Sequence, residues 1–423
     1  MNMIQKNLIK KSAKLDIADL KWILHESSNC LSCFEPPCQQ NCPAEIPIPE
    51  FIRSLQSGNV GYAAKIIRDA NPLAAICGAV CPEEVFCQSQ CTRGKMDNPI
   101  RIRELHSFAT SQEGYIPPVS ASSDAKVAII GAGPAGLACA TKLAEKGIKS
   151  VVYEKSKRIG GVPSSSIPEF RLSDEIISLD IEYTKRFGIE FRLNTKIDDP
   201  EELFDEFDAI FIATGLAQPV ETQIPNSNLS QVIPSLDFLE KARASNINEI
   251  KTKRVVIVGG GNVSLDVAAS AMEHGASEVI LLYRRGLAEM RVWQSELDAA
   301  FKRSVVISYL TAPVRYIEES GRLTGVECIR TRLTSERDTS GRRKPESIPG
   351  TEFVIPADIV IEAIGLNSDY KREITAFPDY TTSIQGIFSG GDWAKGEGTI
   401  VEAVRDGKSA AEAICNYLRV KKI

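Results

Sequence analysis

The sequence predicts an α/β protein in which two parallel-sheet domains, one inserted in the other, follow a helical amino-terminal region. The first observation is a repeat: a strand ending in glycines, a helix and a second strand begin at Lys126 and again at Lys253. The second is the cysteine distribution, because eight of the eleven cysteines lie between Cys30 and Cys91. The third is a stretch rich in Gly, Pro and Ser at 114–125, which separates the two kinds of sequence.

Composition argues against several classes of protein. The 423 residues leave room for about three domains, and a hydrophobic content of 43% is enough for large cores. The formal net charge of −5 argues against a nucleic-acid partner, whose phosphates need a basic surface. No apolar run is long enough to cross a bilayer, and the start lacks the apolar core of a secretion signal. We therefore expect a soluble, cytoplasmic protein with no membrane partner.

The amino-terminal region, 1–115, is expected to be helical and to hold metal. Apolar residues recur with helical spacing at Lys14–Ser27 and Ile48–Ala70. The cysteines follow the patterns C-x2-C-x4-C-x3-C-P from Cys30 and C-x3-C-P-x5-C-x3-C from Cys77. Such runs, with proline after a ligating cysteine, are typical of [4Fe–4S] clusters, each of which takes four thiolates. A pair of zinc sites is the rival interpretation, although only one C-x2-C is present.

The first strand–helix–strand unit carries a dinucleotide fingerprint. In GAGPAG, Gly131 allows a tight turn, Gly133 allows a pyrophosphate to approach, and Gly136 allows close packing of helix on strand. The helix that begins at about Pro134 offers free N–H groups and a positive dipole end to the phosphates. Glu154 ends the next strand, where a carboxylate can accept hydrogen bonds from a ribose. This Rossmann-like unit should take FAD or NAD.

The second unit repeats the fingerprint with one change. The motif GGGNVS contains Gly259 and Gly261, and has Ser264 where the third glycine would stand. Its second strand ends in Arg284 and Arg285, where the first unit has a glutamate. Arginines at this point suit a ribose 2′-phosphate, so we expect NADP here. The alternative is that these arginines are only the solvated end of a strand.

Two further glycine-ended strands, at Ala209–Gly215 and Ile359–Gly365, complete the sheets. After them, GGDWAKGEGT at Gly390–Thr399 places an aspartate between a strand and a long helix, an arrangement that serves the flavin in flavoproteins with two dinucleotide sites. Together with the first fingerprint it makes FAD the expected ligand of the first domain. We place the FAD-binding domain at 126–250 plus 360–423 and the NADP-binding domain at 251–359.

A flavin beside iron–sulfur clusters suits electron transfer. NADPH delivers two electrons as a hydride, a cluster accepts one at a time, and a flavin can exchange either. A disulfide reductase would need a close cysteine pair near the flavin, but Cys139, Cys328 and Cys415 are isolated in the sequence. We expect an NADPH-dependent flavoprotein oxidoreductase in which no side chain acts as a nucleophile. A module that binds nucleotide and clusters without turnover is the alternative.

From Cys30 to the carboxyl terminus the chain resembles a known family, the flavin/iron–sulfur module of dihydropyrimidine dehydrogenase and the glutamate synthase small subunit. The segments AAKIIRDANPLAAICGAVCP, CQSQCTRG, PIRIRELHSFAT and IPEFRL carry the resemblance. It implies a two-cluster ferredoxin-like domain before a pair of disulfide-reductase-like Rossmann domains. The chain looks most like the flavin subunit of NAD(P)-dependent dihydropyrimidine dehydrogenase, whose catalytic partner subunit contains FMN. A glutamate synthase large subunit, or another reductase, is the alternative partner.

The resemblance also implies cofactor-binding residues. For one [4Fe–4S] cluster they are Cys30, Cys33, Cys38 and Cys91. For the other they are Cys42, Cys81, Cys87 and His106. The family has a carboxamide or carboxylate in place of His106, so Cys77 remains the alternative ligand. An imidazole in place of a thiolate should raise the potential of the cluster.

For the nucleotides the resemblance implies two further sets of residues. Those for FAD, besides the fingerprint glycines, are Ala135, Glu154, Gly161, Arg171, Gly391, Asp392 and Thr399. Those for NADP(H) are Gly259, Gly261, Asn262, Val263, Arg284, Arg285 and Arg291, with Ala363 and Gly365 shared near the flavin. Members of the family differ in their choice of NAD or NADP, and the arginines favour NADP here.

Overall fold

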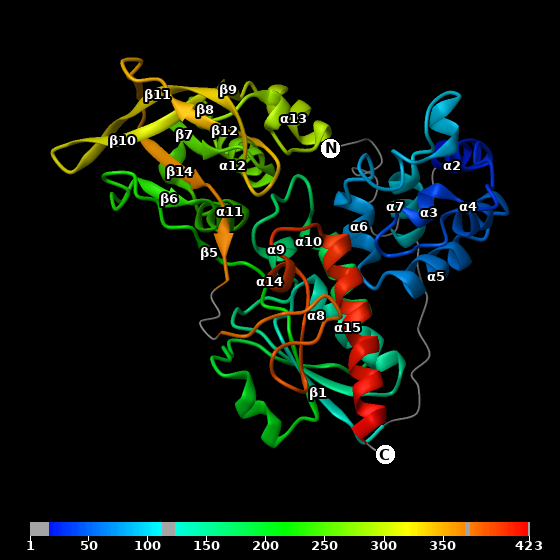
Figure 1. Ribbon diagram of the computed structural model, residues 1–423. Helices are drawn as coiled ribbons and strands as arrows, with labels where there is room; N and C mark the ends of the chain where they lie inside the picture. Colours follow the sequence, from blue (N-terminus) through cyan, green and yellow to red (C-terminus); the bar gives the residue numbers. More distant parts are fainter. Residues whose placement is uncertain (1–16, 112–122, 369–372, 422–423) are drawn as a thin grey trace. The chain divides into compact units, whose positions relative to one another are not determined.

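The computed structural model describes residues 17–111, 123–368 and 373–421 (Figure 1). The chain forms two compact units. The first unit comprises residues up to 164, 169–216 and 368 onward, and the second comprises 165–168 and 217–367. The cysteine-rich helices and the first sheet therefore belong to one unit, and the second sheet belongs to the other.

The described residues of the cysteine-rich part form short helices joined by loops, without a strand. Its helices are α2 (Ile17–Ser28), α3 (Pro37–Gln40), α4 (Ile48–Gln56), α5 (Val60–Ala70), α6 (Ala74–Val80) and α7 (Ile102–Ser111), with a 3-10 turn η1 (Thr92–Lys95). The single helix expected at 48–70 is two helices, because Gly58 adopts a φ of 74°. Asn59 then caps α5 by accepting the N–H of Tyr62 at 3.1 Å.

The first sheet is parallel and has five strands in the order β16-β4-β1-β2-β3. The strands are β1 (Lys126–Ile130), β2 (Lys149–Tyr153), β3 (Glu190–Arg192), β4 (Ala209–Ile212) and β16 (Ile387–Ser389). Helices α8 (Pro134–Glu145) and α15 (Ile400–Lys421) lie side by side against it (Figure 1). Gly407 permits this contact, because a Cβ there would lie 2.1 Å from the carbonyl oxygen of Ala135. Strands β1 and β4 are buried almost throughout, as in parallel sheets covered on both faces.

Shorter elements complete the first unit. The chain forms α9 (Val162–Ser165) and α10 (Asp174–Lys185) between β2 and β3, a 3-10 turn η2 (Pro200–Asp205) before β4, and α14 (Asp392–Lys395) before α15. Among the described residues, no helix is long and apolar enough to cross a membrane.

The second unit repeats the parallel architecture, with strands in the order β6-β14-β7-β8-β9. These strands are β6 (Val232–Pro234), β7 (Arg254–Gly259), β8 (Glu278–Tyr283), β9 (Val306–Tyr309) and β14 (Ile359–Ala363). Its helices are α11 (Ser235–Arg243), α12 (Asn262–Glu273) and α13 (Gln294–Phe301), with 3-10 turns η3 (Asn248–Ile250) and η4 (Leu287–Glu289). The glycine-ended strand and following helix thus occur once in each unit, as the repeat predicts.

An antiparallel sheet, which the sequence did not indicate, adds to the second unit. Its strands are β10 (Thr311–Glu319), β11 (Arg322–Arg337), β12 (Arg343–Ser347) and β13 (Phe353–Pro356), in the order β10-β11-β12 with β13 paired to β11. A short antiparallel pair, β5 (Gln218–Pro219) with β15 (Leu366–Asn367), joins the two ends of the inserted segment.

The domain boundaries differ from those expected at 250 and 359. The second unit begins at 217 and ends at 367. The physical reason is strand pairing: β6 pairs with β14 in register Val360↔Val232, so the segment before 250 completes the second sheet. The β5–β15 pair then holds both ends of the insertion in this unit.

Candidate functional site

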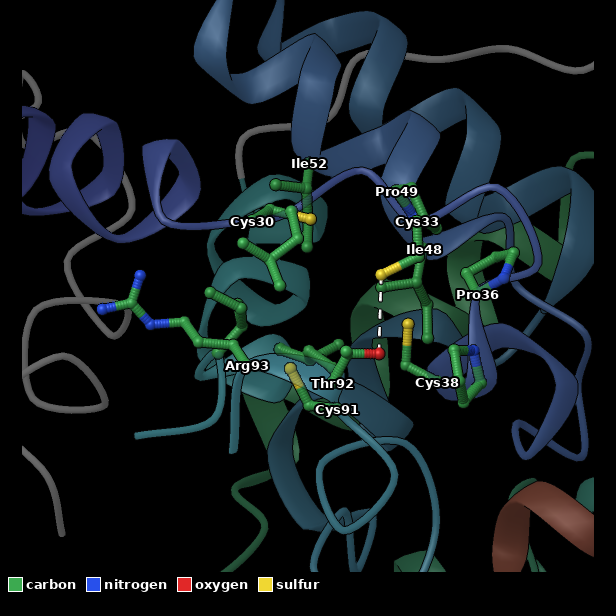
Figure 2. A pocket seen from close by; sticks show the side chains of 14 residues that line it. Cys30, Cys33, Pro36, Cys38, Ile48, Pro49, Ile52, Cys91, Thr92 and Arg93 are labelled. Atoms are coloured by element: carbon green, nitrogen blue, oxygen red, sulfur yellow. Dashed lines mark hydrogen bonds between the residues drawn. The ribbon is translucent and has the colours of Figure 1, made fainter. Parts of the chain in front are cut away.

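The first cavity among the amino-terminal helices is lined by the four cysteines that were assigned to one cluster. It measures about 350 Å³. Cys30 and Cys33 lie in the loop after α2, Cys38 lies in α3, and Cys91 lies just before η1. Figure 2 shows their sulfur atoms around one space, with Cys33 Sγ 3.5 Å from the Thr92 hydroxyl. Separate turns therefore bring four thiols to one place.

The second cavity measures about 390 Å³ and contains all the candidate ligands of the other cluster. Cys42 follows α3, Cys77 lies within α6, Cys81 follows that helix, and Cys87 lies in the next turn. His106 enters from α7. Both candidates for the fourth ligand, the imidazole and the Cys77 thiol, thus line the same cavity.

Burial suppresses the ionisation of these thiols. It raises the pKa of Cys38 and that of Cys77 to about 12, and it also raises the pKa values of Cys81 and Cys87. Neighbouring thiols add to the effect, because adjacent thiolates would repel one another. A cation in the cavity reverses this balance, and a thiol that coordinates a metal is deprotonated outright.

His106 is a buried imidazole with one unpartnered nitrogen. A hydrogen bond to the backbone of Ala74 involves its ring, and Nε2 has no hydrogen-bond partner among the described residues. Burial lowers the pKa of His106 to about 4, so the ring is neutral at neutral pH. Gly78 lets α6 approach closely, since a Cβ there would lie 3.3 Å from the His106 ring and 3.0 Å from the Cα of Ser107. A neutral imidazole with a free nitrogen is the form that binds metals.

The two cavities share a wall. Ile48 and Ile102 line both of them. Val401, in the first turn of α15, lines the second cavity. The second cavity therefore adjoins the first cavity on one side and the long helix of the first sheet on the other.

The donor sets fit iron–sulfur clusters. Among the described residues, no group of three or more His, Cys, Asp or Glu converges on the position of one metal ion. The cysteines instead stand around spaces, on different walls. A cube of iron and sulfide takes one ligand on each of its irons, so thiols spread around a space suit it.

The first glycine turn is built for a close approach of the backbone. Gly131 has a φ of 107°, and a Cβ there would lie 2.4 Å from the carbonyl oxygen of Ala213. At Gly136 a Cβ would lie 2.0 Å from the carbonyl oxygen of Gly131. Helix α8 starts at Pro134, directly after its N-cap Gly133. The turn thus presents a helix N-terminus to the position of a pyrophosphate.

Glu154 stands beside this turn, after the carboxyl end of β2. Its Oε2 accepts the N–H of Ala132 at 2.9 Å, and its Oε1 accepts the N–H of Ser156 at 2.8 Å. The buried carboxylate is therefore held by the backbone, and its remaining lone pairs can accept hydrogen bonds from ribose hydroxyls.

The Gly-Gly-Asp segment also reaches this site. Gly391 has a φ of 67°, and a Cβ there would lie 3.0 Å from the Cβ of Ala135. Asp392 begins α14, and burial, with neighbouring carboxylates, raises its pKa to about 6. Thr399 donates its hydroxyl hydrogen to Glu402 at 2.7 Å and so starts α15. Of the other expected FAD residues, Gly161 approaches the first turn, because a Cβ there would lie 2.8 Å from the Cα of Gly133.

Arg171 lies in the loop between α9 and α10 of the first unit and is partly buried. It takes part in polar interactions within the chain. Its place near the FAD site stays a prediction.

The second glycine turn uses the same geometry with a serine. At Gly259 a Cβ would lie 2.3 Å from the carbonyl oxygen of Ala363, which brings β14 next to the turn. Ser264 is fully buried against Gly259, as a small residue must be at this point. Gly261 is the N-cap of α12, whose first residue, Asn262, accepts the N–H of Trp293 at 3.1 Å.

Two other expected residues flank this turn. Val263 follows Asn262 in the first turn of α12 and packs, partly buried, against the apolar core of the second unit. Gly365 comes just after β14 and has a φ of 120°.

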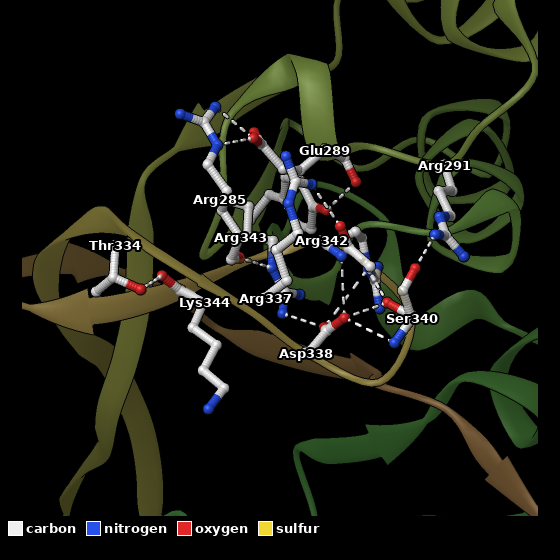
Figure 3. A network of polar contacts seen from close by, with 12 residues as sticks. Arg285, Glu289, Arg291, Thr334, Arg337, Asp338, Ser340, Arg342, Arg343 and Lys344 are labelled. Carbon is white, nitrogen blue, oxygen red and sulfur yellow. Dashed lines mark hydrogen bonds and ion pairs between the residues drawn. The ribbon is translucent and has the colours of Figure 1, made fainter.

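The three predicted arginines have different surroundings, and Figure 3 shows those of Arg285 and Arg291. Arg284 is exposed. Arg285 is buried, with Nη2 donating to Asp338 at 2.7 Å and Nε donating to the carbonyl oxygen of Arg343 at 2.9 Å. Arg291 donates to the carbonyl oxygen of Ser340. The residues that hold Arg285 and Arg291 belong to the β11–β12 hairpin, which the sequence did not connect with the site.

A buried ion pair joins the cysteine-rich helices to the first sheet, and the sequence did not indicate it. Arg68 of α5 pairs with Asp180 of α10, and neither side chain is exposed to solvent. Asp180 also accepts the N–H groups of Ala75 at 3.0 Å and Ile76 at 2.8 Å, at the start of α6. The Asp180 carboxylate, on a helix of the FAD-binding domain, therefore holds the start of α6, the helix that carries Cys77.

Lys408 makes a second such connection. It lies in α15, and its Nζ donates at 2.8 Å to the carbonyl oxygens of Ala44 and Ala70. Ala44 follows the Cys42-Pro43 pair, so this ammonium lies near the second cavity. Burial lowers the pKa of Lys408. A long side chain that crosses between distant segments leaves no local signature in a sequence.

The three cysteines outside the amino-terminal region are buried. Cys139 of α8 and Cys415 of α15 lie in one core beside the first sheet, and Cys328 lies in β11. Burial raises the pKa of each thiol. Buried, protonated thiols are poor nucleophiles, so these residues do not provide the exchange site of a disulfide reductase.

Comparison with known proteins agrees with this geometry. Residues 125–407 match the family profile described as pyridine nucleotide-disulphide oxidoreductase. The chain belongs to this family. Residues 10–115 match a second profile, described as dihydropyrimidine dehydrogenase domain II, 4Fe-4S cluster. This pyridine nucleotide-disulphide oxidoreductase is therefore a flavoprotein oxidoreductase with a 4Fe–4S domain before the nucleotide-binding part.

Relatives of this oxidoreductase include subunits of several enzymes. The NADP(+)-dependent formate dehydrogenase subunit beta of Moorella thermoacetica is 36% identical over 90% of this chain, which spans 60% of that protein. The glutamate synthase [NADPH] small chain of Halomonas elongata is 33% identical, with 93% of this chain and 90% of the relative covered. The NAD-dependent dihydropyrimidine dehydrogenase subunit PreT of Escherichia coli is 32% identical, with 93% and 94% covered.

A solved structure shows the same fold. The His57Gln mutant of FprA from Mycobacterium tuberculosis superposes with a TM-score of 0.61 at 19% identity, covering 71% of this chain and 86% of FprA. The family profile matched over residues 125–407 includes both glycine turns described above.

Proposed function

We propose that this chain is the electron-transfer subunit of an NADPH-dependent enzyme, and that it passes electrons from NADPH through FAD and two [4Fe–4S] clusters to a catalytic partner subunit. The observation that carries the proposal is the position of the second cavity. It adjoins the first cavity through Ile48 and Ile102, and it adjoins α15 of the FAD-binding half through Val401. The second cavity therefore lies next to α15, which packs on the first sheet, and the first cavity lies next to the second.

The chemistry belongs to the cofactors, and the chain binds and orients them. When bound, FAD accepts a hydride from NADPH and releases single electrons, which clusters can carry. The glycine turn at Gly131 and the carboxylate of Glu154 are suited to hold FAD, and the turn at Gly259 is suited to hold NADPH. Orientation alone can account for a large part of the rate, so no side chain needs to act as acid, base or nucleophile.

The first cavity is the side from which electrons would leave. Its four cysteines are partly exposed, whereas Cys42 and Cys87 of the second cavity are buried. Phe34, next to Cys33, is 98% exposed, and Leu31 is 48% exposed. Large exposed apolar side chains beside a cofactor site favour a contact with another protein. We therefore place the docking of the partner subunit at this side.

The first candidate for the partner is the FMN-containing catalytic subunit of a dihydropyrimidine dehydrogenase. The profile matched by residues 10–115 and the similarity to PreT support it. A glutamate synthase large subunit is the second candidate, because the small chain of that enzyme is equally similar. We also place the protein in the cytoplasm, since the cysteines described are all free, as expected in a reducing compartment.

The decisive experiment is anaerobic purification of the chain, followed by flavin, iron and sulfide analysis and by mixing with NADPH. We expect bound FAD, about eight irons per chain, bleaching of the flavin by NADPH, and turnover with ferricyanide. Bound flavin without iron or sulfide, even after cluster reconstitution, would contradict the proposal. Cofactors without turnover would identify a binding module. Reduction of uracil or of 2-oxoglutarate with glutamine, after addition of each partner subunit, would distinguish the two partners.

A further inference from the structure

A hairpin of the second unit brings a group of arginines to the carboxyl end of β8. The hairpin consists of β11, β12 and the turn 338–342. Figure 3 shows the network it forms with the segment after β8. Its arginines are Arg285, Arg291, Arg337, Arg342 and Arg343, and its carboxylates are Asp338 and Glu289. Positive charge is in excess here, although the whole chain carries a formal charge of −5.

Arg285 is a structural member of this network. Its side chain is 4% exposed. It donates to the Asp338 carboxylate at 2.7 Å and to the carbonyl oxygen of Arg343 at 2.9 Å. These bonds use the Nε and Nη2 groups and tie the end of β8 to the hairpin.

The turn itself is held in one shape by Asp338. Its Oδ1 accepts the N–H of Ser340 at 2.9 Å and the N–H of Arg342 at 3.1 Å. Gly341 adopts a φ of 82°, which a residue with a side chain would avoid. Arg291 donates to the carbonyl oxygen of Ser340 from the other side. The turn is therefore arranged before any ligand arrives.

Arg342 and Arg284 are two arginines of this group that lie close enough for their charges to interact across the hairpin and the end of β8. The Nε of Arg342 donates to the Ser340 hydroxyl at 2.8 Å and lies 3.8 Å from Asp338. Arg284 is exposed, and its guanidinium has no hydrogen bond or ion pair within the described part of the chain. Neighbouring atoms partly desolvate the Arg284 guanidinium, and this desolvation, together with the charges of Arg285 and Arg342, lowers its pKa. Asp338 offsets part of the positive charge of Arg285 and Arg342, whereas the charge of Arg284 is balanced by no ion pair of its own among the described residues, so an anion here would gain from Arg284 and Arg342 together.

We propose that Arg342, on the β11–β12 turn, binds the ribose 2′-phosphate of NADPH together with Arg284, and that Arg285 and Asp338 are positioning residues that hold the turn. The inference rests on the proposed function, because it names the nucleotide that the second unit takes. The location identifies the ligand: the end of the second strand of such a unit is where the ribose of a dinucleotide lies. Arginine forks match phosphate oxygens geometrically, which lysines do not.

The test uses the intact flavoprotein and measures binding as well as turnover. Binding of 2′,5′-ADP and of 5′-AMP is measured by calorimetry, and KM is measured for NADPH and NADH with ferricyanide. Arg342→Ala should weaken 2′,5′-ADP binding and raise the NADPH KM by about tenfold to a hundredfold, the usual effect of losing a charged hydrogen bond. Binding of 5′-AMP and the NADH KM should not change.

Two further variants separate the roles. Asp338→Ala should raise the NADPH KM and leave kcat and the NADH KM unchanged, because it frees the turn without touching the nicotinamide side. Arg315→Ala is the control: Arg315 is an exposed arginine of β10 paired with Glu327 at 2.7 Å, outside this group. Arg315→Ala should change neither the binding of 2′,5′-ADP and 5′-AMP nor the KM values for NADPH and NADH.

The outcomes distinguish this inference from the proposed function. If Arg342→Ala leaves the preference for 2′,5′-ADP over 5′-AMP unchanged while Arg284→Ala abolishes it, Arg342 is not a phosphate ligand. A wild-type protein that binds both nucleotides equally would overturn the whole assignment of the site. If neither NADPH nor NADH reduces the flavin although 2′,5′-ADP binds, the proposed function fails and the binding site stands.

Discussion

The two cysteine-lined cavities are built from the same kind of residue but depend on different parts of the chain. Three of the four cysteines of the first cavity, Cys30, Cys33 and Cys38, follow one another in a single loop and short helix. The second cavity draws its walls from α6, α7 and α15, and α15 belongs to the first sheet. Local sequence can therefore specify most of the first site. The second site forms only when the cysteine-rich helices pack on the FAD-binding domain, to which α15 belongs.

The largest effect should come from removing the carboxylate that joins the two halves. Asp180→Ala leaves the buried Arg68 without a partner and exposes the first N–H groups of α6. We expect a loss of about 3–5 kcal/mol in the free energy of unfolding, as for other broken buried pairs. The second cluster should be lost while the first is retained, so that iron falls from about eight to about four per chain. Urea unfolding and iron analysis measure both.

A matched control lies on the same helix. Asp174 of α10 pairs with Arg158 at 2.9 Å, but both side chains are about half exposed. Asp174→Ala should therefore cost less than about 1 kcal/mol and leave the iron content unchanged. If Asp180→Ala loses both clusters together, the two cavities are not independent, and the distinction drawn between them is wrong.

The next largest effect should come from replacing one cysteine ligand in each cavity and comparing cluster content and stability. Cys38→Ser and Cys87→Ser should each remove one cluster, but only the second should also lower stability. Cys87 is buried, and a serine hydroxyl without a partner there costs about 1–3 kcal/mol. Cys38 is partly exposed, so water can solvate its hydroxyl replacement. EPR spectra of the reduced proteins and thermal melts should show this difference; equal losses of stability would contradict it.

A smaller effect decides the fourth ligand of the second cluster. The unpartnered Nε2 of His106 faces the same cavity as the buried thiol of Cys77. We expect His106→Ala to change the EPR signal and the midpoint potential of one cluster, because a different ligand replaces the imidazole. Cys77→Ala should leave both clusters as they are. The reverse result would assign the ligand to Cys77.

The sequence revealed those parts of the site that depend on local backbone geometry. Gly131 and Gly136 stand where no Cβ fits, so the glycine spacing, together with the predicted strand before it and Glu154 after the next strand, located the first turn. The proline-flanked cysteine runs likewise predicted cysteine-lined sites, and each run supplies three cysteines to one cavity and one cysteine to the other. In the glycine turn and in each cysteine run, residues that are close in sequence are also close in space, so a sequence motif can reveal them.

Long-range features were not predictable in this way. Arg68 and Asp180 are 112 residues apart, and each alone looks like an ordinary surface charge. The role of Arg285 depends on Asp338, which lies 53 residues away in a hairpin without a known pattern. The same reason explains why the second unit begins at 217 and not at the expected 250. The pairing of β6 with β14, which joins segments far apart in sequence, places the residues before 250 in the second sheet.

The smallest expected effect is a pH dependence that belongs to the second cavity alone. In cluster-free protein the pKa of His106 is about 4, below the ordinary value of 6.5. Between these values the unfolded chain binds a proton that the folded chain does not, so stability falls as the pH drops from about 6.5 to about 4 and is unaffected above this window. The loss should reach at most about 3 kcal/mol. Because carboxylates titrate in the same range, the measured quantity is the difference in urea unfolding between wild type and His106→Gln. A difference that stays constant from pH 4 to pH 8 would show that the imidazole is not held neutral by burial, and the contrast with the solvent-accessible first cavity would lose its electrostatic basis.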